Sequence, residues 1–157
     1  GTDYLTSACN RLQADKELRQ RIRDSADSPF AVLSLDINNF KNINDQFGHA
    51  VGDEALVETV RLLQHTLRRS DTLARYGGDE FLIISDTSDP IGLQQMIERI
   101  HQAFFLFNQR AERSYELSLS IGTAIYDPKN RLSQEQLLSV ADARMYQHKQ
   151  EKNEKAQ

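Results

Sequence analysis

A chain of 157 residues, of which 39% are hydrophobic and 27% charged, is long enough to bury one ordinary core and too well mixed to be disordered. Its net charge of −4 argues against binding of DNA or RNA polymers, because nonspecific binding needs a basic surface. The single cysteine, Cys9, excludes an internal disulfide and a thiolate metal cluster, and no apolar run is long enough to span a bilayer. We expect one cytoplasmic domain, residues 1–157, cut from a longer protein that could carry a membrane anchor upstream.

The first half of the chain predicts three helices and one buried strand. Residues 7–25 are rich in Arg, Gln, Leu and Ala and predict a helix. The apolar run Phe30–Ile37 follows a Ser-Pro break and predicts a buried strand. A short polar helix is expected to end at Gly48. The pair Gly52-Asp53 is then expected to open an amphipathic helix, whose apolar residues recur at steps of four and three.

The second half predicts a hairpin, a long strand and two further helices. Short strands at 73–76 and 81–85 flank a Gly-Gly turn, and Asp89-Pro90 is typical of a helix start. Residues 115–126 alternate as a strand does, and a capping box of Ser133 and Gln136 precedes a helix that runs towards Lys149. The polar segment 150–157 is expected to be a frayed tail. The irregular order of strands and helices favours an α+β fold with a mostly antiparallel sheet flanked by helices.

Acidic residues stand at the ends of two predicted strands. Asp36 closes an apolar strand, and Asp79 and Glu80 follow the glycines of the hairpin turn. If the first strand lies beside the hairpin, these carboxylates converge, and a cation such as Mg²⁺ or Mn²⁺ is the natural compensation. Taken singly, each acid is explained as well by solvation. The pair Gly77-Gly78 favours a site, because glycines let a ligand approach the backbone closely.

The segment DINNFKNINDQFGHAVGD adds groups that suit a nucleotide. A helix start near Asn39 offers free backbone N–H groups to an anion, and Lys41 adds a positive charge. Asn44 and Asp53 suit guanine, since a carboxylate accepts from its N1–H and N2–H₂ groups. As alternatives, Asp53 is explained equally well as a helix N-cap, and His49 as a turn residue.

These long motifs resemble the diguanylate cyclase, or GGDEF, family, which makes cyclic di-GMP from two GTP. The resemblance rests on LSLDINNFKNINDQFGHAVGD and ARYGGDEF, and extends to DYLTSACNR at the start, SLSIGTA in the long strand and ADARMYQHK in the last helix. It covers nearly the whole chain and implies a palm-like nucleotidyl cyclase fold.

The resemblance also implies a role for each matching residue. Two metal ions, Mg²⁺ or Mn²⁺, would be bound by Asp36, Asp79 and the carbonyl of Ile37. Asp79 or Glu80 would help to deprotonate the attacking 3′-hydroxyl. The substrate contacts would come from the amides of Asn39 and Phe40, from Lys41 and Lys149 at the triphosphate, from Asn44 and Asp53 at guanine, and from His49, Gly77 and Gly78 around them. The chemistry would be two-metal phosphoryl transfer.

A second constellation precedes the hairpin. Arg68-Arg69-Ser70-Asp71 matches the family's RxxD motif, at which the product inhibits, and Arg99 takes the place of a supporting arginine. An Arg fork can bond O6 and N7 of guanine while a carboxylate accepts from its N1–H. The alternative is a charged helix end, where arginines favour the dipole without any ligand.

The sequence departs from the family pattern at three places. Asn38 stands where many members have a second Asp, and Ser7-Ala8 replaces Gly-Leu in the opening motif. The tail lacks the usual Gly-Arg-Asn, so a basic phosphate contact is missing, for which Lys152 is a candidate replacement out of register.

The resemblance implies an active, product-inhibited cyclase that condenses two GTP and releases pyrophosphate. The alternatives are an inactive cyclic di-GMP receptor and a cyclase that closes one nucleotide on itself. Intact Asp36, Lys41, Asp79 and Glu80 argue against the receptor. Because the product contains two GTP units, the partner is a second copy of the domain. The chain has no heptad seam, so we expect a transient homodimer or one driven from upstream.

Overall fold

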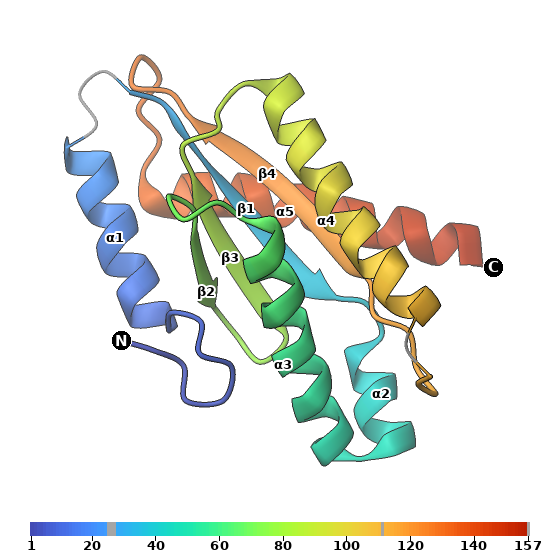
Figure 1. Ribbon diagram of the computed structural model, residues 1–157. Coiled ribbons are helices and arrows are strands. Elements are labelled where there is room, and N and C mark those ends of the chain that lie inside the picture. The colour runs from blue at the N-terminus through green and yellow to red at the C-terminus, as the bar shows by residue number, and fades with distance from the viewer. Residues whose placement is uncertain (25–27, 111, 157) are drawn as a thin grey trace.

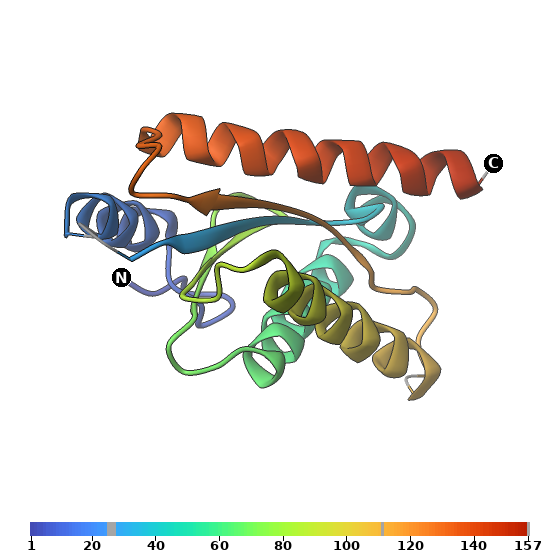
Figure 2. The ribbon, with the colours of Figure 1, turned by 90° about the horizontal axis from the view of Figure 1, so that it is seen from above.

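The computed structural model describes residues 1–24, 28–110 and 112–156, in which a single sheet lies between helical layers (Figure 1). Seen from above, α5 crosses one side of the sheet, and α3 and α4 lie on the other (Figure 2). None of the described helices is long and apolar enough to cross a membrane. The elements in chain order are α1 Arg11–Asp24, β1 Phe30–Ile37, α2 Phe40–Phe47, α3 His49–Thr66, β2 Thr72–Arg75, β3 Glu80–Ser85, α4 Pro90–Arg110, β4 Leu119–Tyr126 and α5 Gln134–Ala156.

The sheet has four strands in the order β2-β3-β1-β4, and all three pairings are antiparallel. The predicted α+β class with an antiparallel sheet is therefore confirmed, as are the hairpin and the bounds of the first strand. β1 is an inner strand and pairs with both the hairpin and β4. In this register Asp36 lies opposite Glu80 on one side and Ser120 on the other.

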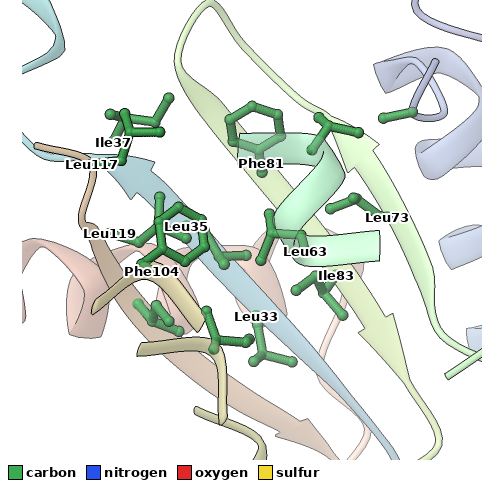
Figure 3. Packing of buried hydrophobic residues seen from close by; sticks show 14 of the residues in the cluster. Leu33, Leu35, Ile37, Leu63, Leu73, Phe81, Ile83, Phe104, Leu117 and Leu119 are labelled. Carbon is green, nitrogen blue, oxygen red and sulfur yellow. The ribbon is translucent and has the colours of Figure 1, made fainter. Parts of the chain in front are cut away.

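Every residue of β1 is buried, because helices cover both faces of the sheet. Leu33, Leu35 and Ile37 point into the core that α3 and α4 close, where Leu63 and Phe104 meet them (Figure 3). The alternate residues Phe30 and Val32 face the layer of α1 and α5. Since side chains alternate along a strand, Asp36 faces α5 as well.

Two helices begin elsewhere than the sequence predicts. α1 starts at Arg11 rather than at residue 7, because Ser7 takes a left-handed φ of 68° and the side chain of Asn10 caps the helix, accepting from the Gln13 amide at 2.9 Å. The predicted helix end at residue 25 lies outside the described residues. α3 starts at His49, three residues before the predicted Gly52, so Asp53 stands inside the helix and is no N-cap.

Other boundaries confirm the capping analysis and correct the strand and tail. Asp89 caps α4 by accepting from Gly92, and Ser133 and Gln136 form the capping box of α5. β4 starts at Leu119, four residues later than predicted, because Asn108 binds both backbone groups of Leu117. The helix α5 continues to Ala156, so residues 150–156 are helical and not a frayed tail.

Candidate active site

The hairpin turn docks on the end of β1 and brings the predicted acids together. The Ile37 amide donates to the carbonyl of Asp79 at 3.2 Å, and Asp36 pairs with Glu80 across the strands. The turn is closed by the amides of Tyr76 and Gly77, which both donate to the carbonyl of Glu80. The convergence expected from the sequence is therefore present.

The glycines of this turn are not needed for its conformation. Neither Gly77 nor Gly78 has a positive φ, and Gly48 alone has one among the glycines of the described ranges. A Cβ atom added at Gly78 would meet no atom within 4 Å, so the turn is open on that side. This supports the interpretation that Gly78 leaves room for a ligand, whereas a Cβ at Gly77 would lie 3.3 Å from the Cβ of Glu80.

The carboxylates are poorly compensated. Asp36 is only 8% exposed; its Oδ2 accepts from Lys149 Nζ at 2.6 Å, and its Oδ1 has no donor among the described residues. Burial, and next a hydrogen bond and the charge of the neighbouring Asp36, raises the pKa of Asp79 to about 6. Burial, Asp36 and Asp142 also raise the pKa of Glu80.

This electrostatic deficit fits a divalent cation. The ammonium of Lys149 faces Asp36 and Asp79 within a partly buried edge, and Glu80 is attracted by the guanidinium of Arg11 and by Lys149. No cluster of three or more His, Cys, Asp or Glu side chains with metal-site geometry occurs in residues 1–24, 28–110 and 112–156. The set expected from the sequence has two carboxylates and a backbone carbonyl, which suits Mg²⁺ because this ion keeps waters and substrate phosphates as ligands.

The start of α2 offers backbone donors beside these acids. Its N-cap, Asn39, has a left-handed φ of 57°, and the Asn39 side chain forms no hydrogen bond with the backbone amides of the first turn. Lys41 lies exposed in that turn. The preceding Asn38 forms hydrogen bonds with one residue just before β4 and one residue within it. Its Nδ2 donates to Ser118 Oγ at 2.8 Å and its Oδ1 accepts from Ser120 Oγ at 2.6 Å. Asn38 thus fixes the loop.

The predicted guanine contacts come from two successive helices, Asn44 from α2 and Asp53 from α3. Asn44 has a buried Oδ1 that finds no donor among the described residues. A Cβ at Gly52 would lie 1.8 Å from that oxygen, so the glycine makes the space in which the amide sits. Asp53 is the next residue and is exposed, and His49 is exposed at the first position of α3. An unpaired buried acceptor next to an open carboxylate suits a base edge rich in N–H donors.

The RxxD residues gather at the other end of the hairpin. Arg68, Asp71 and Arg99 line one hollow of about 330 Å³ between the loop after α3 and helix α4. Asp71 accepts from the Arg68 backbone amide at 2.9 Å and from Ser85 Oγ at 2.7 Å. Since α3 ends at Thr66, both arginines of the motif lie beyond the helix, which weakens the alternative of a charged helix end.

Two contacts near the site were not predicted from the sequence. Arg75 donates from Nε and Nη2 to the carbonyl of Gly78 and from Nη1 to Asp3, so it links the opening motif to the hairpin turn. Both motifs are visible in the sequence, but nothing local pairs residues 72 positions apart. The candidate replacement Lys152 donates instead to the Leu119 carbonyl at 2.7 Å, which is a structural contact.

Comparison with known sequences gives one family. The family described as "Diguanylate cyclase, GGDEF domain" matches residues 1–155. A bifunctional diguanylate cyclase/cyclic di-GMP phosphodiesterase, MucR of Pseudomonas aeruginosa, is 35% identical over 149 residues, which are 94% of this chain and 22% of MucR. The probable diguanylate cyclase DgcC of Escherichia coli is 37% identical over 152 residues, again 94% of this chain and 40% of DgcC. The chain thus spans less than half of these relatives.

Solved structures agree with the sequence comparison and show the palm-like cyclase fold. The GGDEF domain of TpbB, or YfiN, from Pseudomonas aeruginosa superposes with a TM-score of 0.84 at 33% identity, covering 96% of this chain and 90% of that one. The coiled coil and GGDEF domain of DgcB from Caulobacter crescentus, in complex with c-di-GMP, gives a TM-score of 0.85 at 26% identity, covering 95% and 80%.

Proposed function

Because the chain belongs to the GGDEF diguanylate cyclase family, we propose that it condenses two GTP molecules into cyclic di-GMP and releases two pyrophosphates. The observation that carries the proposal is the pair of the buried Asp36 and the half-buried Asp79, where Lys149 is the one cationic side chain among the described residues that attracts both carboxylates. A domain that merely bound a ligand at a distant hollow would gain nothing from keeping these acids at such an electrostatic cost.

The metal ions would be Mg²⁺ or Mn²⁺, two to a site, held by Asp36, Asp79 and the carbonyl of Ile37. When bound, they activate the attacking hydroxyl and neutralise the triphosphate. Among the groups of the chain, the first-turn amides of α2 and the ammonium groups of Lys41 and Lys149 bind and orient the triphosphate.

Glu80 is the better candidate for the base that takes the proton of the 3′-hydroxyl. It is exposed at the start of β3, whereas Asp79 is required as a ligand. Its raised pKa makes it a stronger base than an ordinary carboxylate.

Guanine is read by Asn44 and Asp53, and the product binds in the hollow of Arg68, Asp71 and Arg99. Each domain holds one such substrate site, whereas cyclic di-GMP contains two nucleotides joined twice. Two domains must therefore face each other with their substrates antiparallel, and an upstream region would raise their effective concentration.

Product chromatography after incubation with GTP and Mg²⁺ tests the proposal. Cyclic di-GMP supports it, a cyclic mononucleotide supports the cyclase that closes one nucleotide, and unchanged GTP with binding of cyclic di-GMP supports the receptor. A dilution series then tests the homodimer: we expect the rate per milligram to rise in proportion to protein concentration while the domain is mostly monomeric. A flat profile from a protein that light scattering shows to be monomeric would contradict the two-domain reaction.

A further inference from the structure

The outer edge of β4 is held by side chains of α5. β4 is the last strand of the sheet, so its outward backbone groups have no neighbouring strand among the described residues. Three α5 side chains bond to these groups: Arg144 Nη1 donates to the Thr123 carbonyl at 2.8 Å, His148 Nδ1 accepts from the Ile121 amide at 3.1 Å, and Lys152 Nζ donates to the Leu119 carbonyl at 2.7 Å. We refer to these as the three edge contacts.

The edge contacts follow a matched spacing. On the helix they recur every four residues, an axial rise of about 6 Å; on the strand they recur every two residues, a rise of about 6.6 Å. Backbone groups that point outward from an edge strand alternate in the same way. The two periods stay in step over the whole contact, so together they define one register of α5 along β4.

Close packing between α5 and β4 also prevents the helix from sliding along the strand out of that register. α5 passes behind β4 at an angle in Figure 1 and lies above the strand in Figure 2. A Cβ added at Gly122 would lie 2.1 Å from the Ala141 carbonyl oxygen and 2.1 Å from the Met145 nitrogen. The helix backbone therefore rests directly on the strand at this glycine. From the other side, His101 of α4 packs edge-on against the His148 ring, with 5.6 Å between ring centroids.

The same register brings Lys149 to the active site. Lys149 follows His148 directly and donates to Asp36 at 2.6 Å. Asp36 lies opposite Ser120, which stands between the two edge residues Leu119 and Ile121. Two edge contacts thus flank the point at which Lys149 reaches across β4 to β1.

We propose that His148 and Lys152 are positioning residues, which hold α5 in the register that places the Lys149 ammonium at Asp36 and hence at the triphosphate. This deepens the proposed function and rests on it for the role of Lys149. The edge contacts also prevent another strand from pairing with β4, as protected sheet edges do. That protective role alone would not require His148 to be adjacent to a residue of the site.

The test compares variants of α5 that remove an edge contact, a variant that restores it, and a control. His148→Ala removes the acceptor of the Ile121 amide, and His148→Asn restores an oxygen acceptor near the place of Nδ1. Lys152→Met removes a second edge contact and keeps an unbranched side chain without its charge. Gln147→Ala is the control, because Gln147 is exposed on the neighbouring position. The readouts are amide exchange at Ile121, the NMR signal of the Lys149 ammonium, and KM and kcat for GTP with Mg²⁺.

We expect both variants that remove an edge contact to weaken the Lys149 ammonium signal and to lower kcat/KM about tenfold, since small misplacements of a binding group carry a large kinetic cost. His148→Ala should also speed exchange at Ile121 about tenfold. His148→Asn should restore these values, and Gln147→Ala should change none. Faster exchange with an unchanged ammonium signal and unchanged kcat/KM would overturn the proposal. If the wild-type chain makes no cyclic di-GMP, the proposed function fails, but exchange and the ammonium signal still decide whether the edge contacts place Lys149.

Discussion

The two ends of the β2–β3 hairpin carry acidic residues in opposite electrostatic states. At the turn, Asp79 meets the buried Asp36, and its pKa is raised to about 6 by burial and by that neighbour. At the open end, Asp71 accepts hydrogen bonds from a backbone amide and from Ser85 Oγ. At the turn the negative charge of the carboxylates is poorly compensated, whereas at the open end hydrogen bonds from the chain hold the Asp71 carboxylate in position.

This difference is the one that the proposed function requires between a site for a cation and a site for a base. A metal ion supplies two charges at once, so carboxylates that await it are destabilised until it arrives. A guanine edge brings only N–H donors and acceptors, so the carboxylate that accepts from it works best when it is already fixed in position. The predictions that follow test whether the two ends respond differently to the same kinds of change.

The largest effect is expected at the turn. Asp79→Asn removes a charge that the metal needs, so cyclic di-GMP synthesis should fall about a thousandfold or more. The same change removes the repulsion with Asp36, so the thermal midpoint should not fall. Activity assays and thermal unfolding by circular dichroism check both halves. Near-normal turnover with Mg²⁺ in this variant, or in Asp36→Asn, would refute the assignment of the metal site.

The next effect concerns the base. The wild type should prefer GTP to ATP about a hundredfold or more, because adenine leaves the Asp53 carboxylate unpaired. Asp53→Ala should raise KM for GTP about tenfold and leave ATP unaffected. Because Asp53 is exposed inside α3, which begins at His49, the change removes no helix cap. Glu54→Ala, one position along, controls for the lost charge. Equal competition by ATP and GTP would exclude this role.

A smaller effect is expected at the open end. Arg68→Ala should weaken binding of cyclic di-GMP about tenfold and relieve product inhibition, with little change in the initial rate. The hydrogen bond to Asp71 comes from the Arg68 backbone, so the variant keeps it and the turn should stay folded. Arg69→Ala is the matched control, since Arg69 is absent from the lining of the hollow. Calorimetry that found wild-type affinity in Arg68→Ala would remove the motif as the product site.

The parts of the fold that were predicted correctly depend on local chemistry. The strand Phe30–Ile37 is an apolar run after a proline, and the hairpin is marked by its glycines, so both can be located from neighbouring residues. The sequence predicts the start of α3 three residues too late. Gly48 is both the C-cap of α2 and the N-cap of α3, so it is the single residue between the two helices. Helix starts depend on such backbone geometry, which composition does not reveal.

Contacts between distant segments account for what was missed at the site. The sequence predicts that Asp36 and Asp79 converge if the first strand lies beside the hairpin, and the pairing of β1 with β3 meets that condition. The sequence does not indicate that Asn38 is bound by Ser118 and Ser120, or that Lys152 bonds the edge of β4. Each of these depends on the position of β4 or α5 relative to β1, which only the assembled sheet determines.

The smallest effect, and the one that bears most directly on the comparison, is the pH dependence of stability. The folded-state pKa of Asp79 is raised above its ordinary value of 3.8, so the folded chain holds a proton that the unfolded chain releases. This contribution is fully present below about pH 4 and is lost as the pH rises through about 6. Discounted for partial exposure, the loss is about 1 kcal/mol, or about 2–4 °C in thermal midpoint.

Mg²⁺ should restore that loss at pH 7.5 and have little effect at pH 5, where Asp79 keeps its proton. Thermal unfolding with and without Mg²⁺ at the two pH values measures this. Asp79→Asn should abolish the difference between them. Asp71→Asn, at the other end of the hairpin, replaces one of the two acceptor oxygens by an NH₂ group, so it should lower the midpoint and yet keep the response to Mg²⁺. The comparison fails if Mg²⁺ raises the thermal midpoint equally at both pH values, or if Asp79→Asn keeps the difference between them. In either case the Asp79 carboxylate would not be the group that responds to the cation.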